Sequence, residues 1–285
     1  MLKVAVVGVG HFGRYHAQKY SKMDNVKLVA VVDPDVLKTD TIAHECNTEA
    51  IYDHRYLENH HTVDAVSITA PTKVHFELAS YFLKRGVNVF VEKPICVNID
   101  EADSLIRIAE RQDLVLQVGH IERFNPAVEK IRNLINGERV FIDAERMTPF
   151  VNRSIDVDVI LDLMIHDIDI VLSIANSGVR SIRASGCAVL SDNIDIANAR
   201  IEFESSTMAR VLACRTAATG SRKMVVFGDA DSYMVDFDAY HGDALRRELE
   251  NFVECCTTKA CPLVTGDDGR RALEVALEIR RQIVQ

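Results

Sequence analysis

Hydrophobic residues in the first 120 positions fall in short, nearly continuous runs, separated by longer segments that mix apolar and charged residues. Such runs are typical of strands in a parallel sheet that helices cover on both faces. The segments between them have the length of helices, so this region predicts a doubly wound α/β domain. The five runs are KVAVVG, VKLVAVVD, AVSITAP, VNVFVEK and LVLQVGH.

After residue 120 the hydrophobic pattern changes. Apolar and polar residues alternate over stretches such as RVFIDAERM, ANARIEFE and MARVLACRT. This alternation indicates strands with one buried face, in an antiparallel or mixed sheet backed by helices. The segments 156–175 and 267–284 have the apolar spacing of helices. We therefore expect two domains: a Rossmann doubly wound parallel sheet over 1–120, and an α+β domain with an open-faced, largely antiparallel sheet over 121–285.

The first apolar run ends in the pattern G-x-G-x-x-G, formed by Gly8, Gly10 and Gly13. Between a strand and a helix expected over 12–23, this pattern is typical of a loop that binds the pyrophosphate of a dinucleotide. Asp33 ends the next run, where such folds place the carboxylate that accepts hydrogen bonds from the adenosine ribose. Because no arginine directly follows Asp33 to bind a 2′-phosphate, the sequence favours NAD over NADP.

Composition narrows the possible partners of the chain. The 285 residues carry a formal net charge of −9 and no long Lys/Arg cluster, so we expect no nucleic-acid partner. Neither a signal peptide nor a long apolar span is visible, which predicts a cytoplasmic protein that does not enter a membrane. The seven cysteines lack C-x-x-C pairs, which argues against a disulfide framework and a metal site.

The runs DAVSITAP and GVNVFVEKP, with His75 between them and DLMIHDID in the second half, resemble the Gfo/Idh/MocA family of oxidoreductases over essentially the entire chain. One departure is Ala70, which stands where many members have Thr, with Thr69 just before it. The resemblance implies an NAD-dependent enzyme and a second domain that binds substrate and pairs subunits into a homodimer or homotetramer. The residues expected at the cofactor are Gly8, Gly10, His11, Phe12, Gly13, Asp33, Thr69, Ala70, Pro71, His75, Glu92 and Lys93.

In that family the lysine of the E-K-P motif is catalytic, which here is Lys93. A neighbouring cationic nicotinamide and partial desolvation are expected to lower the pKa of its amine, so that it can take up the hydroxyl proton. His166 is the second candidate for the base, because an imidazole ordinarily titrates near pH 6.5. Asp162 is expected to position it, and Glu92 to orient the site. The sequence leaves open whether Lys93 or His166 is the base.

Further residues are expected to bind substrate where the chain crosses between the domains: His120, Arg123 and Asn125. The stretches GHIERFNP and DIANAR resemble members that oxidise the 3-hydroxyl of a UDP-linked sugar for lipid A synthesis. Candidates for the UDP group are Arg146, Arg153 and Arg215, with Phe150 as a stacking surface. Two alternatives remain: a dehydrogenase of a free polyol or hexose, and a non-catalytic NAD-binding sensor.

Overall fold

The computed structural model describes residues 1–57, 62–135, 139–151, 157–228, 231–239 and 242–284. Its contacts divide the chain into two compact units. The first contains Met1–His120 and Asp243–Arg270, and the second contains Ile121–Gly242 and Arg271–Gln285. The chain therefore passes into the second unit at Ile121, returns to the first at Asp243, and passes into the second again at Arg271.

The first unit is built on a six-stranded sheet in the order β3-β2-β1-β4-β5-β6. All neighbouring strands are parallel, and most residues of the central strands are buried, which explains their unbroken apolar runs. The predicted doubly wound sheet is thereby confirmed. The strands are β1 (Leu2–Val7), β2 (Val26–Val32), β3 (Glu49–Ile51), β4 (Ala65–Ile68), β5 (Asn88–Glu92) and β6 (Leu116–Gly119).

Helices connect these strands and begin at polar caps. The side chains of Asp35 and Asn98 accept hydrogen bonds from the backbone N–H groups of Lys38 and Glu101, which satisfies the free donors of the first turns. The helix expected over 12–23 ends earlier, at Tyr20. The helices are α1 (His11–Tyr20), α2 (Val36–Cys46), α4 (His75–Leu83), α5 (Ile99–Gln112) and α8 (Ala244–Thr258), with short 3₁₀ turns η1 (His54–Tyr56) and η2 (Thr72–Val74).

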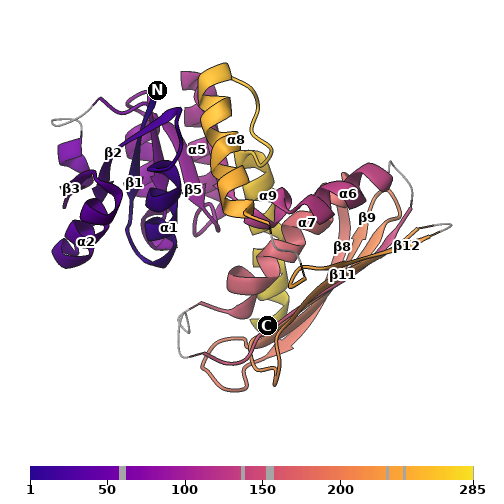
Figure 1. Ribbon diagram of the computed structural model, residues 1–285. Coiled ribbons are helices and arrows are strands. Elements are labelled where there is room, and N and C mark those ends of the chain that lie inside the picture. Colours follow the sequence, from indigo (N-terminus) through magenta and orange to yellow (C-terminus); the bar gives the residue numbers. More distant parts are fainter. Residues whose placement is uncertain (58–61, 136–138, 152–156, 229–230, 240–241, 285) are drawn as a thin grey trace. The chain divides into compact units, whose positions relative to one another are not determined.

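Helix α8 comes from the far end of the chain but packs in the first unit, beside α1 (Figure 1). Its Leu249, Phe252 and Val253 join the same buried cluster as Tyr20, and the rings of Phe90 and Phe252 meet edge to face at 5.8 Å. The segment 121–285, predicted as one domain, thus contributes residues 243–270 to the first unit. The apolar face of an amphipathic helix does not specify which sheet it covers.

The second unit contains a six-stranded mixed sheet in the order β12-β11-β7-β10-β9-β8. Only the central pair β7 and β10 is parallel, and the other neighbours are antiparallel. The elements are η3 (Ile121–Phe124), α6 (Pro126–Leu134), β7 (Phe141–Met147), the π-helical turn η4 (Ile160–Met164), α7 (Ile165–Ala175), β8 (Val179–Cys187), β9 (Ile196–Phe203), β10 (Met208–Cys214), β11 (Ser221–Phe227), β12 (Ser232–Asp236) and α9 (Gly266–Val284).

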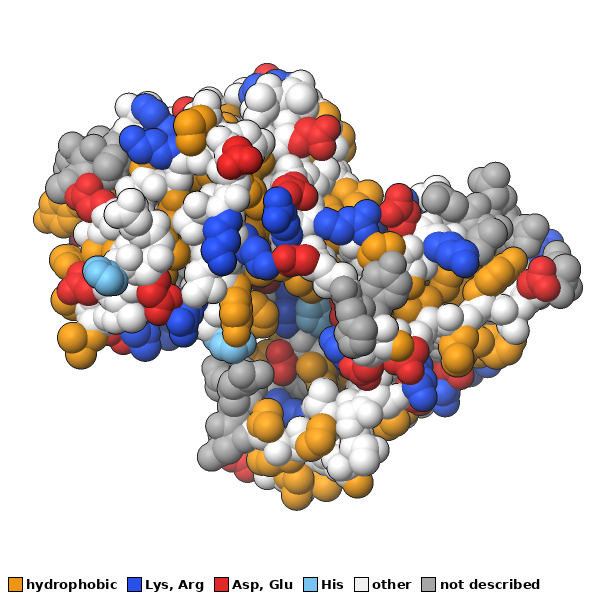
Figure 2. Space-filling view, viewed as in Figure 1, with side chains coloured by type: hydrophobic (Ala, Val, Ile, Leu, Met, Phe, Trp, Pro, Cys, Tyr) orange, Lys and Arg blue, Asp and Glu red, His pale blue; other side chains and the backbone are white. Residues whose placement is uncertain are grey.

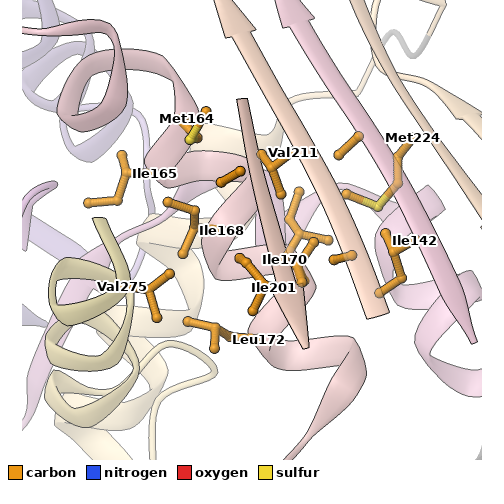
Figure 3. Close-up of a cluster of buried hydrophobic side chains, with 14 of the residues drawn as sticks. Ile142, Met164, Ile165, Ile168, Ile170, Leu172, Ile201, Val211, Met224 and Val275 are labelled. Atoms are coloured by element: carbon orange, nitrogen blue, oxygen red, sulfur yellow. The ribbon is translucent and has the colours of Figure 1, made fainter. Parts of the chain in front are cut away.

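The core of the second unit lies between one face of this sheet and its helices (Figure 3). Alternate residues of the strands, such as Ile142, Ile201 and Val211, lie in one buried cluster with Ile168 of α7 and Val275 of α9. The alternation seen in the sequence is therefore the alternation between this buried face and the outer face.

The surface shows mixed charge, with acidic and basic side chains interspersed on the face seen in Figure 2. In the described part of the chain, no helix combines the length and apolar character needed to cross a membrane. No group of three or more His, Cys, Asp or Glu among these residues is placed to hold a metal ion. All seven cysteines are free, and Cys187 and Cys261 are exposed.

Truncating the buried anchor of α8 tests whether this helix is part of the first unit. We expect Phe252→Ala to lower the free energy of unfolding by about 3–5 kcal/mol, because it leaves a cavity beside Phe90. Urea unfolding followed by circular dichroism measures the change. Leu263→Ala, at a side chain that is 37% exposed, is the control and should cost less. Equal midpoints for wild type and Phe252→Ala would contradict the packing of α8.

Candidate active site

The glycine loop at the end of β1 is held in close contact with its surroundings. Gly8 has a φ of +93°, and its N–H donates to the carbonyl of Val32 at 2.7 Å. A Cβ on Gly13 would lie 1.8 Å from the carbonyl oxygen of Gly8, so only glycine allows α1 to start here. By contrast, a Cβ on Gly10 would meet nothing within 4 Å. The loop is therefore open at Gly10, where a pyrophosphate can approach the first N–H groups of α1.

Asp33 follows β2 and stabilises the same loop. One carboxylate oxygen accepts the N–H of Val9 and the other that of Asp35, both at 2.9 Å. Asp33 also lines a cleft of about 680 Å³ together with Gly8, Ala70 and Pro71. A carboxylate has further lone pairs, so Asp33 retains the capacity to accept from ribose hydroxyls.

The same cleft contains an arginine that sequence reasoning missed. Arg55 of η1 lines it, although it lies 22 positions after Asp33 along the chain. Its guanidinium donates to both carboxylate oxygens of Asp53 and holds the pKa of that carboxyl down at about 2. Arg55 thus pairs with a neighbouring carboxylate, while its side chain remains 71% exposed.

The loop after β4 approaches the glycine loop from the neighbouring strand. The hydroxyl of Thr69 donates to the carbonyl of Gly8, and its N–H donates to Val7 at 2.9 Å. Ala70 has no side chain that can form a hydrogen bond, but the hydroxyl of Thr69 forms one at the preceding position. At the start of α1, His11 and Phe12 are exposed, with their rings in edge-to-face contact at 5.4 Å.

These residues fit a dinucleotide. The strand order reverses between β1 and β4, and the loops that follow these two strands are those of Gly8 and Thr69. In open α/β sheets, ligands bind at this reversal, at the carboxyl ends of the strands. The open side of Gly10, the N-terminus of α1 and Asp33 would hold the pyrophosphate and the ribose.

Lys93 directly follows β5, and its side chain is half-buried. Its backbone N–H donates to Oε2 of Glu92 at 3.2 Å. His75 is buried and lies between two loops, with Nδ1 at 2.9 Å from the carbonyl of Pro94 and Nε2 at 2.7 Å from that of Ala70. Burial lowers the pKa of His75, and the two carbonyls oppose that shift. His75 therefore joins the loops after β4 and β5 through its ring nitrogens.

In the second unit, His166 lies in the first turn of α7 and Asp162 in the π-helical turn before it. A π turn has more residues than an α turn, so the spacing of four no longer places the two side chains one above the other. Both side chains are half-buried. Single π turns within helices are frequent at functional sites, which is consistent with the role expected of this segment.

The acidic neighbours of His166 bind arginines. Asp167 receives two parallel hydrogen bonds from Arg146 of β7, both at 2.9 Å, and Asp169 pairs with Arg123 at 3.2 Å. All four side chains are at least nine-tenths buried. These two ion pairs fix the direction of α7. The sequence pattern indicated neither the π turn nor the ion pair between Arg146 and Asp167.

Several residues expected to bind substrate have structural partners. Arg146 also donates to Glu122, and Arg215 donates to Asp195 and to the carbonyl of Val157, so neither presents a free guanidinium for a UDP group. The side chain of Asn125 caps α6 by accepting from Ala127.

The other expected substrate residues divide between buried and undescribed positions. His120 is 1% exposed and ends the main segment of the first unit. Phe150 is half-buried, and Arg153 lies outside the described residues.

Comparison with known proteins identifies relatives along the whole chain. A family model described as oxidoreductase family, NAD-binding Rossmann fold, matches residues 2–120, and the GFO/IDH/MocA C-terminal domain matches residues 137–234. UDP-N-acetylglucosamine 3-dehydrogenase of Acidithiobacillus ferrooxidans is 34% identical over 98% of this chain and 96% of its own length. A solved structure of that enzyme aligns with a TM-score of 0.95, covering 99% of this chain and 97% of its own. The NAD-dependent scyllo-inositol 2-dehydrogenase of Bacillus subtilis is 26% identical over 97% of this chain and 92% of its own length.

Substitutions at Gly10 and Gly13 distinguish an effect on cofactor binding from an effect on stability. We expect Gly10→Ala to leave the melting temperature without NAD unchanged but to weaken NAD binding about tenfold or more, which is about 1.4 kcal/mol, because its methyl group enters the open side of the loop. Gly13→Ala should lower the melting temperature even without NAD, because its Cβ collides with Gly8.

Calorimetric titration with NAD and thermal melts measure both effects. Gly220→Ala is the control, since its nearest neighbour is 3.7 Å away. NAD binding that is unaffected by Gly10→Ala would contradict the assignment of this loop to the pyrophosphate.

Proposed function

The chain belongs to the GFO/IDH/MocA oxidoreductase family, and we propose that it oxidises the 3-hydroxyl of UDP-N-acetylglucosamine to a ketone with NAD as the electron acceptor. Its membership of the family and its full-length relatives show that the chain is an NAD-binding oxidoreductase acting on sugars. The proposal for the substrate rests on one observation: the UDP-N-acetylglucosamine 3-dehydrogenase matches both units at 34% identity with the same fold.

Oxidation of a secondary alcohol requires a base for the hydroxyl proton and an acceptor for the hydride. NAD, when bound, supplies the acceptor. The chain must supply the base and the alignment. Lys93 follows the carboxyl end of β5, at the edge of the sheet where the glycine loop also lies, and is proposed to take the proton on Nζ. His166 is proposed to act with it on the substrate, with Asp162 as a positioning residue.

A free polyol or hexose is the second candidate substrate. Inositol dehydrogenases match the chain from end to end at lower identity, for example the Bacillus subtilis enzyme at 26% and a myo-inositol 2-dehydrogenase of Thermotoga maritima at 24%. The buried positions of Arg146 and Arg215 also remove two of the cations that were expected to bind a UDP group.

A substrate panel distinguishes the two candidates. NADH formation is followed by absorbance with UDP-N-acetylglucosamine, myo-inositol, scyllo-inositol and glucose, each with and without a transaminase and glutamate that remove the ketone. We expect a signal with UDP-N-acetylglucosamine that the transaminase increases. A signal with an inositol or glucose alone would assign the second candidate, and silence with every sugar, with intact NAD binding, would favour a sensor.

Substitution of the two candidate bases tests their roles. We expect Lys93→Ala to lower kcat by about 10²–10⁴-fold with little change in the Kd of NAD, because the hydroxyl proton loses its acceptor. His166→Asn should have an effect of the same order if it shares the proton. The pH dependence of kcat/KM identifies the base, because its acidic limb should disappear in the variant that lacks the titrating group. Wild-type turnover by Lys93→Ala would overturn the mechanism.

We also propose that the chain forms a homodimer or homotetramer through the outer face of its second sheet. Phe141 of β7 and Phe227 of β11 are paired across these strands, with their rings 6.1 Å apart and both partly exposed. Exposed aromatic pairs of this kind are typical of interfaces.

We expect light scattering to give the mass of a dimer or tetramer for the wild type and a smaller mass for Phe227→Lys. The control Leu37→Lys changes a residue of the first unit that is 81% exposed and should leave the mass unchanged. A monomeric wild type would contradict this proposal.

A further inference from the structure

A buried polar chain lies behind Lys93 and contains a histidine that the mechanism above does not use. His16 of α1 is fully buried. Its Nδ1 lies 2.8 Å from the hydroxyl of Ser67 on β4, and its Nε2 lies 3.2 Å from Oε1 of Glu92 at the end of β5. The ring therefore connects one helix with two neighbouring strands inside the first unit.

The partners of His16 determine where its hydrogen lies. A carboxylate only accepts hydrogen bonds, so Nε2 carries the hydrogen that faces Glu92. Nδ1 of a neutral ring then accepts from the hydroxyl of Ser67, which can rotate to donate. The ring of Phe90 packs against the imidazole edge to face, with centroids 5.3 Å apart, and restricts its rotation. His16 is thus held in one orientation, with Nδ1 hydrogen-bonded to Ser67 and Nε2 at ion-pair distance from Glu92.

Glu92 transmits this arrangement to Lys93. While Oε1 faces His16, Oε2 accepts the backbone N–H of Lys93 at 3.2 Å. The carboxylate also lies close to β6, where a Cβ on Gly119 would come within 2.9 Å of Oε2. On the other side of Lys93, the carbonyl of Pro94 contacts the buried ring of His75. The backbone is therefore held before and after Lys93 by different side chains.

We infer that His16 is a positioning residue for Lys93: it holds the carboxylate of Glu92 through Nε2 and thereby fixes the backbone from which the lysine side chain extends. The inference rests on the proposed function, because it matters to turnover only if Lys93 acts on the substrate. The effect of a substitution at His16 should then depend on which of its two polar contacts is preserved, the one with Glu92 or the one with Ser67. If His16 only stabilised the fold, loss of either contact would have the same effect on turnover.

Substitution by the two amide residues distinguishes the contact of the ring with Glu92 from its hydrogen bond with Ser67. The amide nitrogen of Gln can take the place of Nε2 and donate to Glu92, whereas the shorter Asn reaches only the place of Nδ1, beside Ser67. We expect His16→Gln to keep kcat within about threefold of wild type and His16→Asn to lose about 10- to 100-fold in kcat. The KM for NAD and for the sugar should change little in both, because the glycine loop and Asp33 are untouched.

The kinetic assay uses the sugar of the panel above that gives the fastest NADH formation. Three further variants complete the design. His16→Asn in the Lys93→Ala background should cause no additional loss of rate, because the lysine through which it acts is absent. Ile42→Val, a small truncation in the buried cluster that contains Phe90, controls for general destabilisation and should leave kcat unchanged at a comparable loss of melting temperature. His44→Asn, at an exposed position of α2, controls for the substitution itself.

A measurement without cofactor or substrate tests the geometry directly. Long-range ¹H–¹⁵N spectra of the ring nitrogens should show a hydrogen on Nε2 of His16. In Glu92→Ala this preference should be lost, while in Glu92→Gln, whose amide oxygen still accepts, it should persist. If both His16 variants fail to fold, the comparison of Glu92→Gln with Glu92→Ala still tests the inference, with the larger loss of kcat expected for Ala.

The outcomes separate the inference from the proposed function. If Lys93→Ala turns over substrate like the wild type, the mechanism fails and the inference fails with it. If Lys93→Ala is inactive but His16→Asn and His16→Gln lose activity equally, or His16→Asn adds to the loss in the Lys93→Ala background, the mechanism stands and the positioning role of His16 is overturned. A ring protonated on Nδ1 alone would also overturn it.

Discussion

The close contact between α1 and the end of β1 is the constraint on which the first unit depends. Gly13 lies so near the carbonyl of Gly8 that no larger residue fits, and this contact sets where α1 starts relative to the sheet. One turn later the same helix brings His16 against Ser67 and Glu92. The glycine that shapes the loop after β1 thus also sets where His16 meets Glu92, next to Lys93. The glycine loop and the segment of Lys93 are therefore in contact with the same short helix.

The fold was largely predictable where the burial of a strand produces a distinct hydrophobic pattern in the sequence. Strands β1, β2, β4, β5 and β6 are covered on both faces and appear as apolar runs, and strands such as β7 and β9 are half-covered and appear as alternation. Strands β3 and β12 each bury only one residue, so they show neither an apolar run nor a regular alternation, and they were missed. The placement of α8 was also missed, because its apolar stripe shows that it packs but not on which unit.

In the candidate site too, features that form a local sequence pattern were predictable, whereas features that depend on tertiary packing were not. Gly8, Gly13, Asp33 and Lys93 could be proposed for the site from the sequence because each occupies a fixed position in a short motif, next to a strand end. The partners of the arginines were not, since Arg146 and Asp167 are 21 positions apart and meet only through the packing of α7 on β7. A charged residue in a sequence looks the same whether it binds a ligand or another side chain. Only the tertiary contacts showed that Arg146 and Arg215 bind aspartates.

The buried ion pairs of the second unit have a consequence for His166. A buried charge is costly unless its partner satisfies it, and the parallel hydrogen bonds between Arg146 and Asp167 meet that condition. Successive residues of an α-helix are rotated by about 100°, so Asp167 and Asp169 point to either side of His166. Because each is tied to its own arginine, α7 is fixed against rotation about its axis. The ion pairs of Asp167 and Asp169, on either side of His166, therefore set the orientation of its side chain. The π turn at Ile160–Met164 allows the chain before α7 to leave the axis of that helix.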